Sequence, residues 1–114
     1  MNDEADELAL CRVTQMGLLR LLTNAAITKD DVLTRRQAWE ILEQLMEDTR
    51  VRMLREPAGL EQIWKAFSRR EDRSHLLWTD DYLAAFAQAG NDELVTFDRA
   101  FSRRYPSVKV VLLV

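Results

Sequence analysis

Two neighbouring segments decide the fold of this chain: LWTDDYLAAFA from Leu77 to Ala87 and ELVTFDRAF from Glu93 to Phe101. The first segment predicts a helix, because Thr79 is a good N-cap and acidic residues follow it in the first turn, where the helix dipole favours negative charge. Gly90 supplies a stop signal at the C-terminal end of this helix. The segment therefore places a carboxylate at a helix start.

The second segment opens with an apolar run, Leu94 to Phe97, which is short enough for a buried strand. Asp98 then falls where the chain leaves the sheet. In open α/β sheets, ligand groups gather at the carboxyl ends of strands and at the adjoining helix starts. We therefore expect Asp80 and Asp98 to face each other across one cleft.

The rest of the chain alternates apolar strands with amphipathic helices. The expected strands are 8–13, 51–54 and 108–114, and the expected helices are 15–23, 34–48 and 60–67. Thr34 and Gln37 form a capping box at the start of the helix over 34–48. Strands separated by helices predict an α/β fold with a parallel sheet covered on both faces.

These segments resemble the PIN-domain nucleases, most closely the VapC-type toxins of bacterial toxin–antitoxin pairs. The family's late motif is an Asp that opens a helix of the form Asp-x-[Tyr/Leu]-[Leu/Ile]-Ala-Ala-x-Ala, and then a strand ending Leu-Val-Thr-x-Asp-x-x-Phe. Asp80 to Ala87 and Leu94 to Phe101 match both pieces in order. Upstream, Cys11 to Asn24 is similar to the strand-to-helix segment of the same subgroup.

The resemblance implies a single domain over residues 1–114, a PIN-like three-layer sandwich with a mainly parallel sheet flanked by helices. Family members begin with a strand that ends in an Asp metal ligand, and a strand with its crossover needs roughly 30 residues. Only Met1 to Glu7 precede the expected second strand, so we expect the N-terminal βα unit to be missing. The family's second acid is usually Glu, and Gln15 at that position is a poorer ligand for a hard divalent cation.

The function that the resemblance implies is metal-dependent endoribonuclease activity, which cleaves RNA phosphodiester bonds. Asp80 and Asp98 would bind Mg²⁺ or Mn²⁺, and Thr96 would orient one of them through its hydroxyl. Asp81 is the alternative to Asp80, although the family motif places the ligand first in the pair. From the residues alone, acids in a first turn are also common helix-start residues, and an Asp after a strand is a common turn residue.

The partners implied by the resemblance are an RNA substrate and a cognate antitoxin protein. The alternative reading is an inactive remnant that binds an antitoxin or itself. In the family the lost strand is central, so its absence would leave strand edges that invite pairing with another chain. A homodimer is therefore expected under either reading.

The formal net charge of −3 provides no general basic field for nucleic acid. Contacts to RNA must then come from local clusters, namely Arg69–Arg70, Arg73 and Arg103–Arg104. The simpler interpretation of these clusters is that they are solvated helix ends, because Arg near a helix C-terminus is favourable for dipole reasons alone.

Several other features indicate an ordinary cytoplasmic protein. Cys11 is the only cysteine and is expected to pack as a small hydrophobe, so nothing argues for secretion. No signal peptide or membrane-spanning run is apparent. His75, the only histidine, is expected in the loop before the Asp80 helix and is poor evidence for zinc. The three tryptophans are interpreted as core or interface anchors rather than as a base-stacking platform: Trp39, Trp64 and Trp78.

Overall fold

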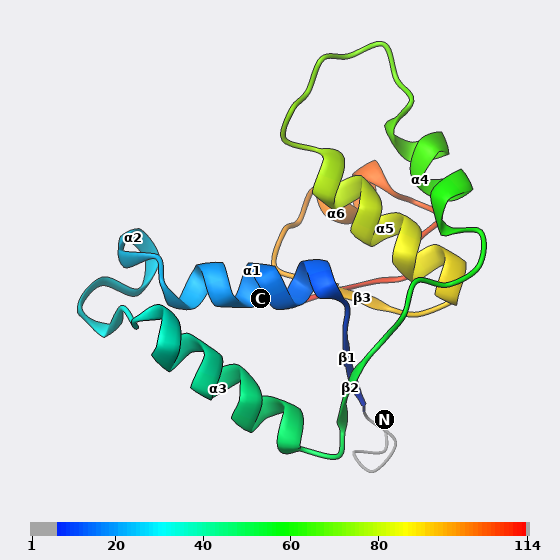
Figure 1. Ribbon diagram of the computed structural model, residues 1–114. Coiled ribbons are helices and arrows are strands. Elements are labelled where there is room, and N and C mark those ends of the chain that lie inside the picture. The colour runs from blue at the N-terminus through cyan, green and yellow to red at the C-terminus, as the bar shows by residue number, and fades with distance from the viewer. Residues whose placement is uncertain (1–6, 114) are drawn as a thin grey trace. The chain divides into compact units, whose positions relative to one another are not determined.

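The computed structural model describes residues 7–113 and divides the chain into two compact units (Figure 1). The first unit ends at Arg55, and the second begins at Glu56. Of the expected terminal strand 108–114, residue Val114 lies outside the described residues.

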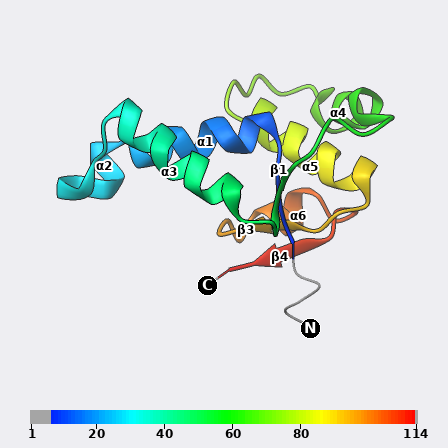
Figure 2. The same ribbon diagram turned by 60° about the horizontal axis from the view of Figure 1, so that its bottom comes forward.

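The first unit contains two short strands and two long helices. Its elements are β1 (Leu8–Leu10), α1 (Arg12–Leu22), α2 (Ala25–Thr28), the 3-10 turn η2 (Lys29–Asp31), α3 (Arg35–Glu47) and β2 (Val51–Met53). β1 and β2 pair in parallel, with Leu8 opposite Val51. α1 and α3 lie against each other and run in opposite directions (Figures 1 and 2).

Side-chain caps determine where the helices of this unit begin. The predicted capping box is confirmed, because Gln37 N donates to Thr34 Oγ1 at 3.1 Å and Thr34 N donates to Gln37 Oε1 at 2.9 Å. α1 begins before the predicted residue 15, because Thr14 Oγ1 accepts a hydrogen bond from Cys11 N at 2.8 Å and so satisfies a donor at the helix start. Cys11 is buried, as expected.

The core of the first unit leaves large apolar side chains of α1 and α3 partly exposed. Ala38 and Leu42 on α3 are buried, but Trp39 is 48% exposed and Leu21 on α1 is 43% exposed. Successive helical residues point about 100° apart, so Trp39 is turned away from the side that Ala38 buries. Of the two positions expected for Trp39, core or interface anchor, its exposure excludes the core.

The second unit carries the segments that decide the fold. Its elements are α4 (Leu60–Ser68), α5 (Trp78–Gly90), β3 (Leu94–Thr96), α6 (Phe101–Arg104) and β4 (Val110–Leu112). β3 and β4 pair in parallel, with Leu94 opposite Val110, and α4 packs along α5. The α/β class with parallel pairing is confirmed, although the described strands form two separate two-stranded ladders.

The core of the second unit fixes α6 against α5. Its buried members are Ala84, Ala87, Phe101, Tyr105 and Val108. The alanines on α5 are small, so the aromatic rings at the two ends of α6 can approach this helix closely. The ring centroids of Phe101 and Tyr105 lie 4.7 Å apart, in the range of favourable aromatic pairs. This packing sets the position of Arg104, which lies between them in sequence.

The ends of α5 differ from the prediction by one or two residues. Thr79 lies inside the first turn and not at the N-cap, which is Leu77 and makes no side-chain cap hydrogen bond. Gly90 is the last helical residue, and Asn91 adopts the left-handed conformation with φ of 54°. A Cβ at Gly90 would lie 2.7 Å from Asp92 Oδ2, so a larger residue there would require the Asp92 carboxylate to move. Among residues 7–113, no helix is long and apolar enough to cross a membrane.

Candidate functional site

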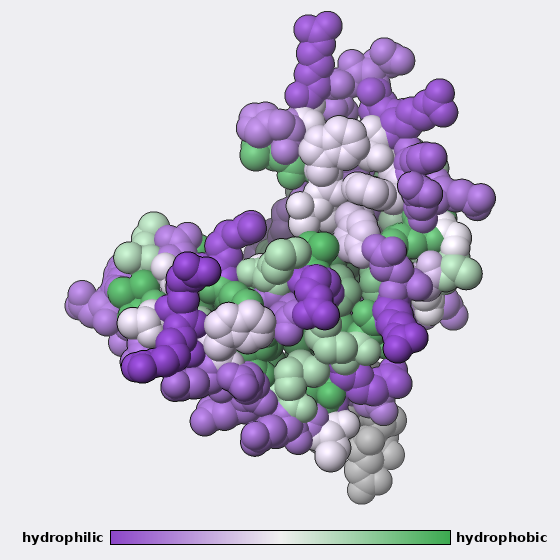
Figure 3. Space-filling model, viewed as in Figure 1, coloured by the Kyte–Doolittle hydropathy of each residue, from purple (hydrophilic) through white to green (hydrophobic). Residues whose placement is uncertain are grey.

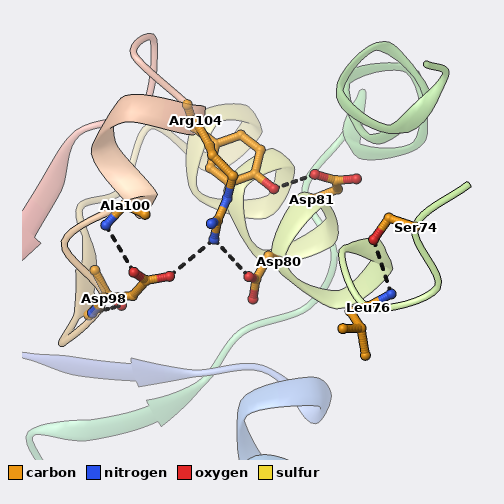
Figure 4. Close-up of polar contacts among 9 residues, drawn as sticks. Ser74, Leu76, Asp80, Asp81, Asp98, Ala100 and Arg104 are labelled. Atoms are coloured by element: carbon orange, nitrogen blue, oxygen red, sulfur yellow. Dashed lines mark hydrogen bonds and ion pairs between the residues drawn. The ribbon is translucent and has the colours of Figure 1, made fainter. Parts of the chain in front are cut away.

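Arg104 links two carboxylates that the chain brings together within the second unit. Its Nη2 lies 3.0 Å from Asp80 Oδ2 and 3.1 Å from Asp98 Oδ2 (Figure 4). Asp80 comes from the first turn of α5, Asp98 from the loop after β3, and Arg104 from the end of α6. The structure thus brings Asp80 and Asp98 to one guanidinium group, as their expected proximity requires.

Backbone hydrogen bonds fix Asp98 in the loop after β3. Its Oδ1 accepts from Ala100 N at 2.9 Å, and its own backbone N donates to Thr96 Oγ1 at 3.1 Å. The Thr96 hydroxyl therefore orients Asp98 through the backbone rather than through the carboxylate. Local bonds of this kind hold a short polar side chain in one rotamer without help from distant residues.

The neighbouring carboxylate, Asp81, faces the core instead. It is buried, and the Tyr105 hydroxyl donates a hydrogen bond to its Oδ1. Burial raises the pKa of Tyr105, and the hydrogen bond to Asp81 raises it further. Figure 4 shows Asp80 and Asp81 pointing in different directions from the same helical turn. The structure thus brings Asp80, and not its alternative Asp81, to Asp98.

The pKa values of the two paired carboxylates are shifted in opposite directions. Burial raises the pKa of Asp80, an effect that Arg104 opposes and that Asp98 and Asp81 reinforce. The backbone hydrogen bond from Ala100 lowers the pKa of Asp98, and Arg104 and Arg103 lower it further. Carboxylates whose environments separate their pKa values are typical of sites where acids take different roles.

Sequence reasoning missed the role of Arg104, which it treated as part of a basic cluster. The guanidinium carbon lies 5.8 Å from the ring centroids of both Phe101 and Tyr105, at a distance typical of cation–π contacts. One available signal was the spacing of Phe101 and Arg104, which places them on the same side of a helical turn. The spacing alone does not predict the contact between Arg104 and Asp80, because that contact also requires α6 to pack on α5.

The donor atoms of the pair fit a hard cation. Mg²⁺ and Mn²⁺ prefer carboxylate oxygens, and here two such oxygens converge on one positively charged nitrogen. Within the described range, no group of three or more His, Cys, Asp or Glu side chains converges on one point. Gln15, at the family's second acidic position, lies on α1 in the first unit, where its side chain is buried and accepts a hydrogen bond from Arg12 Nη1.

Comparison with known proteins gives consistent matches. A family model described as PIN domain matches residues 1–105, a range that includes the Asp80–Asp98–Arg104 cluster. Two curated relatives, both called Ribonuclease VapC41, come from the CDC 1551 and H37Rv strains of Mycobacterium tuberculosis. Each is 43% identical to this chain over 107 residues, which cover 90% of this chain and 73% of the relative.

Proposed function

Because this chain belongs to the PIN-domain family, as its motifs predicted, we propose that it is a toxin-type endoribonuclease that cleaves RNA phosphodiester bonds. The observation that carries the proposal is the convergence of Asp80 and Asp98 on one cationic group. The family match extends over residues of both units, which supports the further proposal that residues 1–114 make up one domain.

We propose that the activity depends on Mg²⁺ or Mn²⁺ held by Asp80 and Asp98. A bound divalent cation would acidify a water molecule and neutralise charge on the phosphate that is cleaved. Thr96 would act as a positioning residue, because its hydroxyl fixes the backbone of Asp98.

The charges of Asp98 and Arg104 suit them to different roles in the proposed reaction. Asp98, whose pKa is lowered, stays ionised and supplies oxygen ligands at neutral pH. Arg104 keeps a guanidinium at the two carboxylates, within reach of a phosphate group that lies there. Charge-assisted bonds from Arg to phosphate are strong and geometrically specific, so Arg104 is suited to hold the substrate in line with the carboxylates.

We also propose that the protein binds a cognate antitoxin, forms a homodimer and acts on RNA in the cytoplasm. Membership of the family supports the antitoxin, and two exposed apolar side chains in the second unit support protein contacts: Leu76 is 75% exposed and Phe97 is 78% exposed. A solution mass near twice 13.3 kDa, measured by light scattering, would support the homodimer. A monomer mass would contradict it.

The experiment that tests the enzymatic proposal is cleavage of a labelled single-stranded RNA by the purified chain. We expect cleavage with Mn²⁺ or Mg²⁺ and none with EDTA. A folded protein that cleaves no RNA under either condition would contradict the proposal and favour the protein-binding alternative.

A further inference from the structure

A cavity of about 630 Å³ opens in the second unit, beside the carboxylate pair. Its walls are the end of α4, the loop over residues 69–77, the start of α5 and the end of α6. Arg104 lines the cavity and also binds Asp80 and Asp98, so the cavity and the candidate metal site share one side chain. The volume is within the range of about 300–1,000 Å³ that small-ligand pockets occupy.

The walls of this cavity are basic although the chain as a whole is acidic. Four arginines line it, Arg70, Arg73, Arg103 and Arg104, together with two aspartates, Asp72 and Asp81. Asp81 is bound by the Tyr105 hydroxyl, and the chain carries a formal net charge of −3. Hydrophilic side chains crowd the end of this unit that carries the loop (Figure 3). Because Arg104 is paired with Asp80 and Asp98, the attraction for an anion comes from the other three arginines of the cavity.

One wall offers an aromatic surface. Trp78, at the start of α5, lines the cavity and is 55% exposed. Its backbone carbonyl accepts a hydrogen bond from Trp64 Nε1 at 3.2 Å, which anchors it to α4. An exposed aromatic ring beside arginines is the combination that binds single-stranded nucleic acid, because bases stack on the ring and phosphates pair with the cations.

The loop that forms the outer wall is held by its own side chains. Asp72 Oδ1 accepts from Ser74 N at 3.0 Å. Ser74 Oγ accepts from Leu76 N at 3.2 Å (Figure 4). Local bonds of this kind fix the loop that presents Arg73 and the predicted loop residue His75 to the cavity.

We propose that this cavity holds one nucleotide of single-stranded RNA next to the bond that is cleaved. The base lies against Trp78, and the phosphate lies on Arg73 and Arg103. Basic residues alone would suit an acidic peptide equally well, but an aromatic wall and a side chain shared with the carboxylate pair favour a nucleotide of the substrate. The inference rests on the proposed ribonuclease function and adds the site at which the substrate is held.

The test measures binding separately from cleavage. All variants carry Asp98→Asn and are kept in EDTA, so that cleavage is suppressed by both the substitution and the removal of metal. The probe is a fluorescein-labelled single-stranded RNA of about 12 nucleotides, within the site sizes of single-strand binders. Fluorescence anisotropy in EDTA gives the Kd. We expect Trp78→Ala to weaken binding by about 5- to 150-fold, the range for loss of one base-stacking contact. We expect Arg73→Gln and Arg103→Gln each to reduce the slope of log K against log salt by about 0.7.

The chain offers matched controls for these variants. Trp39→Ala removes an exposed tryptophan of the first unit, and Arg36→Gln removes an arginine of the same unit whose side chain is 85% exposed and does not line the cavity. Both should bind RNA like the Asp98→Asn parent. An RNA with one abasic nucleotide at the bound position should bind the parent more weakly, and should lose little further affinity when Trp78→Ala is present.

The outcomes separate this inference from the function on which it rests. If the cavity variants bind RNA as tightly as the controls while the wild-type chain cleaves it, the cavity is not the nucleotide site and the ribonuclease proposal stands. If the folded wild-type chain neither binds nor cleaves RNA, both proposals are wrong. Circular dichroism of each variant excludes unfolding as the cause of lost binding.

Discussion

Asp80 and Asp98 accept hydrogen bonds from the same nitrogen atom, Nη2 of Arg104, at 3.0 and 3.1 Å. The two carboxylates come from different elements, and the packing of α6 on α5 holds the arginine that bridges them. A guanidinium therefore occupies the position where two oxygen ligands converge. Any divalent cation that binds both carboxylates must compete with it.

This competition leads to an expectation for metal affinity. Arg104→Gln removes the competing cation and keeps a polar side chain, so Mn²⁺ should bind more tightly by about fivefold, the effect of roughly 1 kcal/mol from two partly exposed ion pairs. Isothermal titration calorimetry of Mn²⁺ into the metal-free wild type and the metal-free variant measures the change in affinity. Weaker Mn²⁺ binding in the variant would mean that Arg104 holds the carboxylates in place instead of competing for them.

The opposite pKa shifts of the pair can be measured in the metal-free protein. Carboxyl ¹³C shifts should show Asp98 titrating below the ordinary aspartate value and Asp80 above it. Arg104→Gln should raise the pKa of both, because the attraction of the guanidinium favours the ionised forms. Titration of Asp80 below Asp98 would contradict the electrostatics described for the site.

These shifts also fix the sign of the dependence of stability on pH. Asp98 has a lowered pKa in the folded state, so its stabilising contribution is complete above the unfolded pKa and is lost as pH falls through the folded pKa. Asp80 has a raised pKa, so it favours the folded state while protonated, and this contribution is lost as pH rises through its folded pKa. Urea unfolding of Asp98→Asn should therefore show less loss of stability on acidification than the wild type.

The buried Tyr105–Asp81 hydrogen bond should matter for stability. Tyr105→Phe leaves the buried Asp81 carboxylate without this donor, so the free energy of unfolding should fall by about 1–3 kcal/mol. As a control, Tyr82→Phe removes a more exposed bond to Glu56 and should change stability by no more than about 0.5 kcal/mol. Equal losses in the two variants would show that burial of Asp81 has no special cost.

The small residues of α5 should tolerate no added volume. Ala84 is fully buried against the aromatic residues of α6, so Ala84→Leu should destabilise the protein by about 1–3 kcal/mol through overpacking. Ala66→Leu on the exposed side of α4 adds the same atoms and should be nearly neutral. Thermal unfolding of both variants compares them directly. An equally stable Ala84→Leu would mean that the contact between α5 and α6 is looser than described.

Local sequence signals predicted the elements well where caps and periodicity agree. The capping box at Thr34 follows from short-range chemistry, whereas Thr79 has the chemistry of an N-cap but lies inside the first turn of α5. The family motif led to Asp80 and Asp98. Features that depend on tertiary packing were predicted less well. Trp39 was expected as a core or interface anchor and is not in the core, and the short strands pair only in twos among the described residues.

The sequence pointed to the two acidic residues of the candidate site, Asp80 and Asp98, but not to the arginine that bridges them. Arg104 belongs to a run of two arginines near a helix end, a pattern that the helix dipole alone explains. Its role depends on the tilted ring pair of Phe101 and Tyr105, against which the guanidinium lies while it contacts carboxylates from two other elements. No local pattern encodes that arrangement.

The most direct test of the metal site compares Mn²⁺-dependent RNA cleavage by the wild type, Asp80→Asn, Asp98→Asn and the exposed control Asp92→Asn. Loss of a ligand should cost more than the 10- to 100-fold typical of outer-shell groups, so we expect Asp80→Asn and Asp98→Asn each to reduce the rate by about a hundredfold or more. Asp92→Asn should cleave like the wild type. Full activity in Asp80→Asn or Asp98→Asn, in a protein that remains folded, would contradict the proposal that this carboxylate pair is the catalytic metal site.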